Sequence, residues 1–178
     1  MDLVLNTLGA EVSEGVFRAL LSGKEVEIMD TSLMKIAHCV GCNQCWLRTP
    51  GVCAFKDDYE EILKKLVKTD SLWIVTDTRF GFLDYRGKRL MDRVMPMLNM
   101  YIGFRDGWMR HELRYHPLNI GLLYKGAGDQ ALLEDYFVNK VKVGLNTGVM
   151  FGPEGLGYMR LNAGCPRSML EFDLPEVK

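Results

Sequence analysis

The stretch Ser71-Leu-Trp-Ile-Val-Thr76 decides the fold of this chain. Its near-continuous apolar run predicts a central strand of a parallel sheet, because helices cover both faces of such a strand. Residues 58–69 precede it and carry apolar side chains at the spacing of an amphipathic helix. A helix that leads directly into a buried strand is part of a β-α-β unit, so the sequence predicts an α/β fold.

The segments before this helix show the same alternation. Residues 3–5 are a short apolar run, and residues 12–21 carry apolar side chains at helical spacing. Residues 25–29 alternate polar and apolar side chains, as a strand does. We therefore expect a strand, a helix and a second strand, and a mostly parallel sheet with helices on both faces.

Downstream of the central strand, residues 77–87 read as a polar loop. Residues 88–102 have apolar side chains at helical spacing and predict a helix that Pro96 kinks. Residues 110–117 are basic and aromatic and predict an exposed loop. Residues 119–124 predict the next strand.

The last part of the chain has a different composition. Residues 130–145 predict one further helix that runs into an apolar segment. Residues 148–166 are rich in glycine and proline around one short strand, residues 157–161, and Pro166 opens a last short helix. The expected organisation is an α/β domain, residues 1–129, and a C-terminal segment that completes or extends it, residues 130–178.

Composition limits the classes of function. The 178 residues are 48% hydrophobic, enough for one buried core. With 22 basic and 23 acidic side chains the net charge is -1, so we expect no nucleic-acid partner and no anionic membrane partner. The N-terminus shows no targeting pattern and no stretch reaches the length of a membrane span, so we expect a cytoplasmic protein.

Four of the five cysteines lie in the motif Cys39-x2-Cys42-x2-Cys45-x7-Cys53. In a reducing compartment, clustered cysteines are more often metal ligands or redox thiols than disulfides. Thiolates at this spacing suit a [4Fe-4S] cluster or zinc. The alternative interpretation is a tight loop of free or redox thiols that are partly buried.

The carboxyl ends of the predicted strands form the expected ligand edge of the sheet. A phosphate-binding loop there needs small side chains and backbone donors. The loop after the first strand supplies such residues, namely Asn6, Thr7, Gly9 and Ser13. It also contains Glu11 and Glu14, whose charges oppose a phosphate, so an ordinary strand-to-helix turn is the alternative.

The residues that carry a family resemblance are the block from Cys39 to Asp58 and, downstream, Gly81-Phe82, Lys88, Asp92-Arg93, Pro96, Tyr101-Ile102 and Arg114-Tyr115. Together they resemble the flavodoxin-like NAD(P)H-dependent FMN reductases and the iron-sulfur flavoproteins, over residues 1–125. The resemblance implies a doubly wound parallel sheet of order 2-1-3-4-5 that binds FMN at the strand ends. It also implies a homodimer or homotetramer that receives electrons from NAD(P)H or from a protein donor.

In such proteins the loop after the first strand holds the flavin phosphate, and the loop after the third contacts the ring. The positions that this implies for FMN are Thr7, Gly9, Ser13, Thr76, Thr78, Arg79, Phe80, Gly81 and Phe82. Arg79 is a candidate partner for the phosphate. No side chain is required to act as an acid or a base.

The predicted function is therefore FMN-dependent electron transfer of the NAD(P)H-dependent FMN reductase kind. A first alternative is an iron-sulfur flavoprotein whose [4Fe-4S] cluster is ligated by Cys39, Cys42, Cys45 and Cys53. A second is a degenerate, cofactor-free protein that acts as a scaffold or interaction partner, which the two carboxylates of the first loop favour.

The C-terminal segment carries a second resemblance. The pattern Gly148-x2-Phe151-Gly152-x2-Gly155-x-Gly157-Tyr-Met-Arg160-Leu-Asn-x-Gly164-Cys-Pro-Arg-Ser168 resembles the C-terminal end of PLP-dependent aminotransferases of the cystathionine β-lyase type, over residues 140–171. In that family the arginine that matches Arg160 binds the substrate carboxylate. The lysine region and the large PLP domain have no counterpart here, so we expect a fusion remnant or a subunit-packing arm rather than PLP catalysis.

Overall fold

A computed structural model describes residues 1–21, 25–105, 108–116, 118–126, 128–134, 145–151 and 157–163. The central sheet is built from β1 (Asp2–Asn6), β2 (Val26–Asp30), β3 (Ser71–Arg79), β4 (Phe82–Leu83), β7 (Asn119–Lys125), β8 (Leu145–Phe151) and β9 (Gly157–Ala163). A separate hairpin consists of β5 (Leu98–Arg105) and β6 (Trp108–Leu113). The helices are α1 (Glu14–Leu20), α2 (Gln44–Leu47), α3 (Tyr59–Leu66), α4 (Tyr85–Asp92) and α5 (Gln130–Glu134), with short 3₁₀ turns η1 (Gly9–Glu11) and η2 (Met95–Met97).

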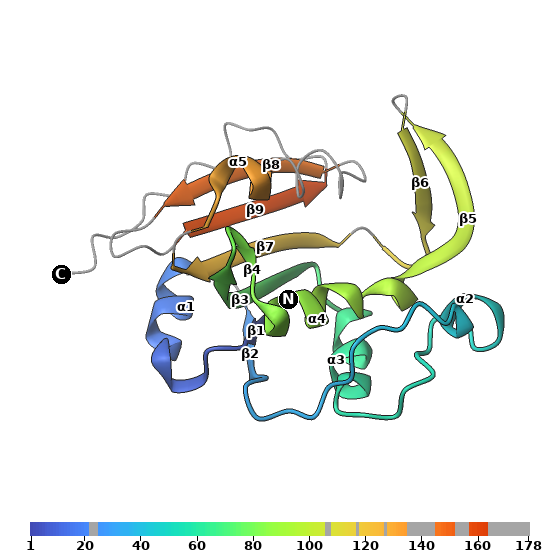
Figure 1. The fold of residues 1–178 in the computed structure, drawn as a ribbon, viewed down its shortest axis with the longest axis horizontal. Coiled ribbons are helices and arrows are strands. Elements are labelled where there is room, and N and C mark those ends of the chain that lie inside the picture. Colours follow the sequence, from blue (N-terminus) through green and yellow to red (C-terminus); the bar gives the residue numbers. More distant parts are fainter. Residues whose placement is uncertain are drawn as a thin grey trace.

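The central sheet has the order β2-β1-β3-β7-β9-β8, and β4 pairs with β3 (Figure 1). Strands β2, β1, β3 and β7 are parallel, which confirms the predicted α/β fold with a mostly parallel sheet. The place beside β7 is taken by β9, which is antiparallel and pairs in turn with β8. The described residues therefore do not form the expected fifth parallel strand of a 2-1-3-4-5 sheet.

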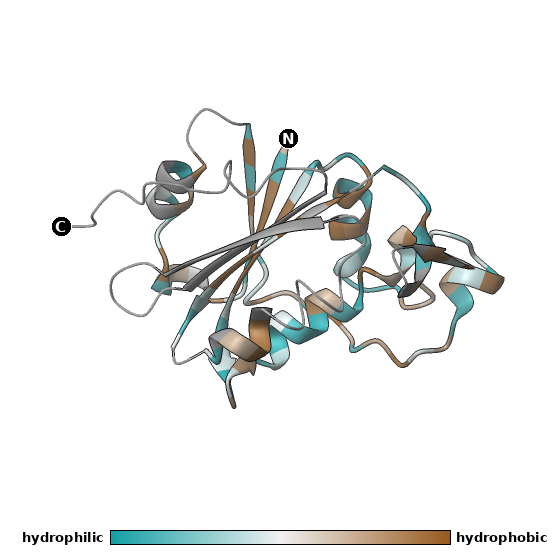
Figure 2. Cartoon of the chain, turned by 90° about the horizontal axis from the view of Figure 1, so that it is seen from above, coloured by the Kyte–Doolittle hydropathy of each residue, from teal (hydrophilic) through white to brown (hydrophobic). Residues whose placement is uncertain are grey.

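Helices cover both faces of the sheet because its central strands are apolar on both sides (Figure 2). Leu3 and Leu5 of β1 pack into the core that α3 and α4 cover, whereas Val4 packs on the α1 side with Phe17 and Trp73. The alternation follows from the two-residue period of a strand. The run at residues 71–76 is buried throughout, as its composition predicts.

The predicted helix at residues 88–102 is wrong in its second half. Helix α4 ends at Asp92, Pro96 lies in η2, and β5 begins at Leu98. The apolar spacing continues past the proline, but Pro96 lacks the N–H that a helix interior needs. The segment pairs instead with β6, in the stretch for which we expected an exposed loop. In Figure 1 this hairpin extends away from the central sheet.

The expected polar loop at residues 77–87 is also more ordered than predicted. Strand β3 continues to Arg79 and folds back into β4 through Phe80 (φ 53°) and Gly81 (φ 79°). Two consecutive positive φ angles are typical of a type I′ hairpin turn. Asp84 then caps α4, because its carboxylate accepts the backbone N–H groups of Arg86 and Gly87.

The C-terminal predictions are met in part. Strand β9 confirms the short strand predicted at residues 157–161, and α5 confirms the start of the helix predicted at residues 130–145. Strand β8 differs from the expectation, which ends a helix and apolar segment near residue 145 and begins a glycine-rich segment at residue 148. The helix expected at Pro166 lies outside the described residues. None of the described helices is long and apolar enough to cross a membrane.

The central strand should dominate stability. We expect Ile74→Ala to lower the free energy of unfolding by about 2–5 kcal/mol, because Ile74 is fully buried in β3 and its loss leaves a cavity. Leu33→Ala is the control, since Leu33 is 90% exposed and should change stability by no more than about 0.5 kcal/mol. Urea denaturation measures both, and equal effects would contradict the assignment of β3 as the core strand.

Candidate functional site

The cysteine motif surrounds one pocket. Its walls include Cys39, Cys42, Cys45 and Cys53, with Trp46 and Arg93 beside them. All four cysteines are free thiols; the first two are exposed and the last two are half-buried. Residues 39–53, the cysteine loop, thus bring together all four cysteines that we expected as ligands.

The thiols lie close enough to influence one another. Burial raises the pKa of the Cys45 thiol, and the charges of the other three cysteines raise it further. Such mutual repulsion opposes loss of the proton in the metal-free protein, and a bound cation reverses it because a coordinating thiol is deprotonated. The electrostatics of the pocket therefore suit a group that carries positive charge.

The spacing of the donors bears on which metal group fits. Among the described residues, no three His, Cys, Asp or Glu side chains are arranged to hold a single metal ion. A zinc ion with Zn–S bonds of about 2.3 Å requires sulfur atoms within about 4 Å of one another. A [4Fe-4S] cluster binds each thiolate through a different iron and spreads the four sulfur atoms more widely. Four free thiols around one hollow supply the donor set for such a cluster.

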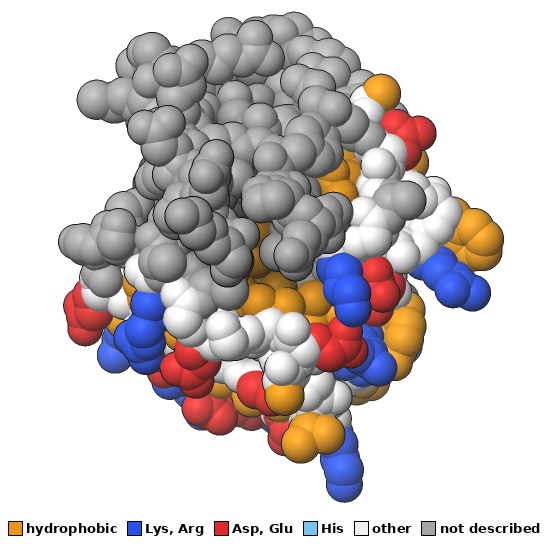
Figure 3. Space-filling model, turned by 90° about the vertical axis from the view of Figure 1, so that its left-hand side faces the viewer, with side chains coloured by type: hydrophobic (Ala, Val, Ile, Leu, Met, Phe, Trp, Pro, Cys, Tyr) orange, Lys and Arg blue, Asp and Glu red, His pale blue; other side chains and the backbone are white. Residues whose placement is uncertain are grey.

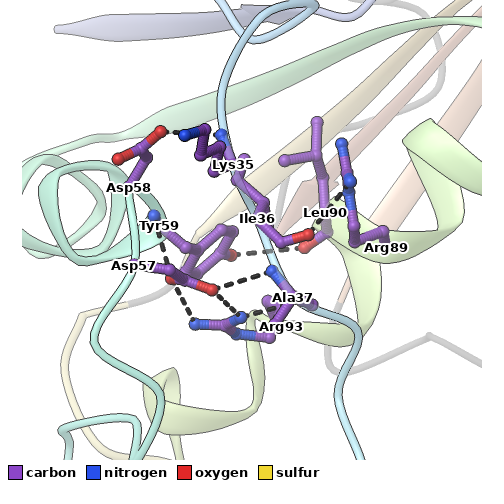
Figure 4. Close-up of polar contacts among 9 residues, drawn as sticks. All are labelled: Lys35, Ile36, Ala37, Asp57, Asp58, Tyr59, Arg89, Leu90 and Arg93. Carbon is purple, nitrogen blue, oxygen red and sulfur yellow. Dashed lines mark hydrogen bonds and ion pairs between the residues drawn. The ribbon is translucent and has the colours of Figure 1, made fainter.

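A buried ion pair holds the start of the cysteine loop. Asp57 lies beside the first turn of α3, and Arg93 lies at the end of α4. The Asp57 carboxylate accepts hydrogen bonds from both terminal nitrogens of Arg93, with N–O distances of 2.8 and 3.0 Å (Figure 4). The side chains are 14% and 1% exposed, respectively. Arg93 also donates to the Ala37 carbonyl at 2.8 Å, and Asp57 accepts the Ala37 N–H at 2.8 Å. The pair therefore fixes the backbone two residues before Cys39.

Neighbouring contacts continue this attachment along residues 35–37. Asp58 accepts the Lys35 N–H at 2.7 Å, and Arg89 donates to the Ile36 carbonyl at 3.0 Å. Figure 4 shows that the segment runs between the N-terminal end of α3 and the side of α4. The backbone of residues 35–37, which leads into the cysteine loop, is therefore fixed against α3 and α4.

The ion pair depends on the ionised form of Asp57. Burial alone would raise the pKa of its carboxyl, but hydrogen bonds from Arg93, Ala37 and Tyr59 hold that pKa below its ordinary value. Arg93 in turn keeps a raised pKa despite its own burial, through Asp57 and the nearby Cys53. Both groups remain charged at neutral pH.

The other side of the loop rests on the β5–β6 hairpin. Trp46 donates its indole N–H to the Met95 carbonyl at 3.0 Å, and its ring lies 4.4 Å from that of His111 on β6. Gly51 has φ 82°, and a Cβ atom there would lie 2.5 Å from the Tyr115 hydroxyl. Glycine is thus required where the loop approaches the end of the hairpin.

The residues implied for the flavin lie at the other candidate site, at the carboxyl edge of the sheet. Thr7 directly follows Asn6, the last residue of β1, and Thr76 lies within β3, one position past Val75, the partner of Asn6. The chain leaves these strands toward opposite faces of the sheet, so they flank the topological switch point where α/β proteins bind ligands. The Thr7 hydroxyl is buried and has no hydrogen-bond partner among the described residues, while Thr76 donates to Asp84 at 2.6 Å.

The loop after β1 is partly closed on itself. Asn6 accepts the Leu8 N–H at 3.0 Å and donates to the Gly9 carbonyl at 2.8 Å. Glu11 forms an ion pair with Lys125 at 2.8 Å, which neutralises one of the two carboxylates that oppose a phosphate. Ser13 is exposed just before α1 and makes no side-chain capping bond.

The remaining residues implied for the flavin belong to the β3–β4 hairpin: Thr78, Arg79, Phe80, Gly81 and Phe82. Phe80 is 95% exposed, and the guanidinium of Arg79 lies 5.6 Å from the centre of its ring. The arginine that reaches Thr7 is Arg86, which donates to the Thr7 carbonyl at 3.3 Å. Arg86 is not among the residues predicted from the sequence; the Asp84 cap, which places Arg86 in the first turn of α4, is the signal that could have indicated it.

The surface charge agrees with the composition. On the face in Figure 3, the described basic and acidic side chains are intermixed and form no patch of one sign.

Comparison with known proteins finds several iron-sulfur flavoproteins. One from Methanocaldococcus jannaschii is 33% identical over 103 residues, which are 58% of this chain and 47% of that protein. One from Archaeoglobus fulgidus is 37% identical over 71 residues, 40% of this chain and 34% of that protein. The chain thus spans less than half the length of these curated relatives. The similarity supports the first family resemblance.

A protein of another kind also matches. Protein MalY of Escherichia coli (strain K12) is 38% identical over 81 residues, 46% of this chain but 18% of that protein. This match gives limited support to the second resemblance, that of the C-terminal segment. No family model matches the sequence, and no solved structure gives a significant match.

The buried ion pair predicts a stability that depends on pH. We expect Asp57→Asn to lower the free energy of unfolding by about 3–5 kcal/mol at pH 7, because it leaves the Arg93 charge buried and unpaired. The folded pKa of Asp57 is depressed, so its contribution is full above the unfolded pKa of about 3.9 and is lost as pH falls through the folded pKa. The difference between wild type and variant should therefore shrink at pH 3.

Urea denaturation at the two pH values measures this difference. Glu61→Gln on α3 is the control, because the Glu61 side chain is 64% exposed and its ion pair is worth at most about 1 kcal/mol. A wild-type advantage over Asp57→Asn that stays constant between pH 7 and pH 3 would show that the carboxylate is not the stabilising group.

Proposed function

We propose that the chain is a flavin-dependent electron-transfer protein whose cysteine pocket holds an iron-sulfur cluster. The observation that carries the proposal is the convergence of four free cysteines on one pocket with no disulfide among them. The similarity to proteins named iron-sulfur flavoproteins supports it. When bound, such a cluster exchanges electrons at a potential set by its surroundings.

In this proposal the protein's own residues have separate tasks. Cys39, Cys42, Cys45 and Cys53 bind the irons as thiolates. The Asp57–Arg93 pair holds the first of these cysteines at its position, and Trp46 closes one wall of the pocket. Since the attachments lie on both sides of the loop, they restrict the positions of the thiol groups before a cluster binds, which lowers the cost of ordering the loop on binding.

We place FMN at the switch point between β1 and β3. The buried Thr7 hydroxyl, which no other group in the described part of the chain engages, can donate to a phosphate oxygen, and Arg86 adds positive charge beside it. The exposed ring of Phe80 on the β3–β4 hairpin is suited to contact a flat flavin ring. NAD(P)H or a protein donor supplies the electrons, and the chain acts as a cytoplasmic homodimer or homotetramer.

A cofactor-free scaffold is the second candidate function. The observation that favours it is the set of contacts within the loop after β1. There the Asn6 side chain accepts the Leu8 N–H, and Glu11 forms an ion pair with Lys125. Both groups that a phosphate needs there, a backbone donor and a cation, are already engaged. Colourless protein with no shift of melting temperature on addition of FMN would favour this function over electron transfer.

Iron analysis tests the cluster. Protein purified without oxygen, or reconstituted with ferrous iron and sulfide, should bind about four irons per chain and absorb broadly in the visible region. Cys42→Ser should lose most of that iron because it removes one ligand. Cys165→Ser, which changes the fifth cysteine, should retain it, and equal iron content in the two variants would exclude the pocket as the cluster site.

Flavin titration tests the switch point. We expect Thr7→Val to weaken FMN binding about tenfold, or about 1.4 kcal/mol, because the flavin phosphate loses one hydrogen bond. Thr69→Val, a buried threonine at the opposite edge of the sheet, is the control and should leave the affinity unchanged. Arg79→Ala tests the other candidate arginine: an unchanged Kd removes Arg79 as the partner of the phosphate. Flavin fluorescence quenching gives each Kd.

A further inference from the structure

Arg93 has contacts beyond those that hold the start of the cysteine loop. Its two terminal nitrogens satisfy Asp57 and the Ala37 carbonyl. Its guanidinium also lies 4.8 Å from the ring centre of Tyr59 and 5.6 Å from that of Phe55, so aromatic faces enclose it. At 1% exposure it is a cation almost entirely removed from water, and it forms part of the wall of the cysteine pocket.

One donor of this arginine is left over. The Nε–H group is buried and has no hydrogen-bond partner within the described part of the chain. Buried N–H groups are nearly always paired, and an orphan at a pocket wall points to a partner that binds there. The residues that line the same pocket include the four cysteines, Cys39, Cys42, Cys45 and Cys53, and their sulfur atoms are the groups there that a metal centre would use.

We propose that Arg93 sets the reduction potential of the metal centre in this pocket, by presenting its positive charge and its free Nε–H to the sulfur atoms of that centre. This inference rests on the proposed function, since it requires a centre bound by the cysteines. It assigns to Arg93 a role toward the cofactor in addition to its role in the fold.

The physical argument is electrostatic. Reduction adds one negative charge to the centre, and a nearby cation stabilises the reduced form more than the oxidised form. Hydrogen bonds to the sulfur atoms and local charge are the means by which a protein tunes such a potential. Arginine suits the task because its guanidinium stays ionised in a protein. Asp57 opposes it, because the paired carboxylate cancels part of the same field.

The two members of the pair therefore predict shifts of opposite sign. Arg93→Gln removes the cation and should make the midpoint potential more negative, lowering the ratio of reduced to oxidised centre about tenfold at a fixed potential, which is 59 mV for one electron. Asp57→Asn leaves the cation uncompensated and should make the potential more positive. Loosening of the loop alone, the merely structural role, gives no reason for opposite signs.

The test is an anaerobic redox titration of the full chain reconstituted with iron and sulfide, with dithionite as reductant and visible absorbance as readout. Tyr59→Phe is the matched control: it removes the hydrogen bond to the Leu90 carbonyl in the same cluster but changes no charge. Its potential should equal that of wild type. Arg93→Lys keeps the charge and should lie between wild type and Arg93→Gln.

The outcomes separate this inference from the proposed function. Wild-type protein that takes up no iron overturns both. Iron-loaded variants with unchanged potentials, or shifts of the same sign in Arg93→Gln and Asp57→Asn, overturn only the role of Arg93. If Arg93→Gln fails to fold or to retain iron, Asp57→Asn and Arg93→Lys decide: a potential in Asp57→Asn that does not become more positive than wild type overturns the inference.

Discussion

The buried pair between Asp57 and Arg93 is the interaction on which the rest of the site depends. Two charges removed from water are tolerated only when geometry and additional hydrogen bonds compensate for the lost hydration. Here Asp57 also accepts two backbone N–H groups, and Arg93 also donates to the Ala37 carbonyl. The same groups that make the pair stable therefore connect α3, α4 and the start of the cysteine loop into one unit.

The molecule has two candidate sites, the cysteine pocket and the strand edge at Thr7, and different contacts hold each of them. The cysteine pocket lies where the loop is held between the ends of two helices and the base of the β5–β6 hairpin, so its geometry follows from tertiary contacts. The strand edge at Thr7 follows from the topology of the sheet itself. The two candidate sites are therefore held by separate contacts.

Beside β7, the described part of the chain has an antiparallel strand in place of a fifth parallel one. Strand β9 runs antiparallel to β7 and satisfies the backbone groups that β7 would otherwise leave at an open edge. The sequence signalled a change of character here through its glycine content and its second resemblance. The direction of the strands depends on pairing between segments that are distant in the chain, and no local pattern encodes it.

The sequence by itself determined the alternation of strands and helices, the central position of residues 71–76 and the grouping of the four cysteines, because these depend on local periodicity and spacing. Tertiary structure decided that residues 98–105 form a strand with β6, that Arg93 pairs with Asp57 across 36 positions, and that Arg86 rather than Arg79 reaches Thr7. Each of these depends on a partner remote in sequence. Contacts between residues that are distant in sequence form only in the folded chain, so local sequence patterns do not predict them.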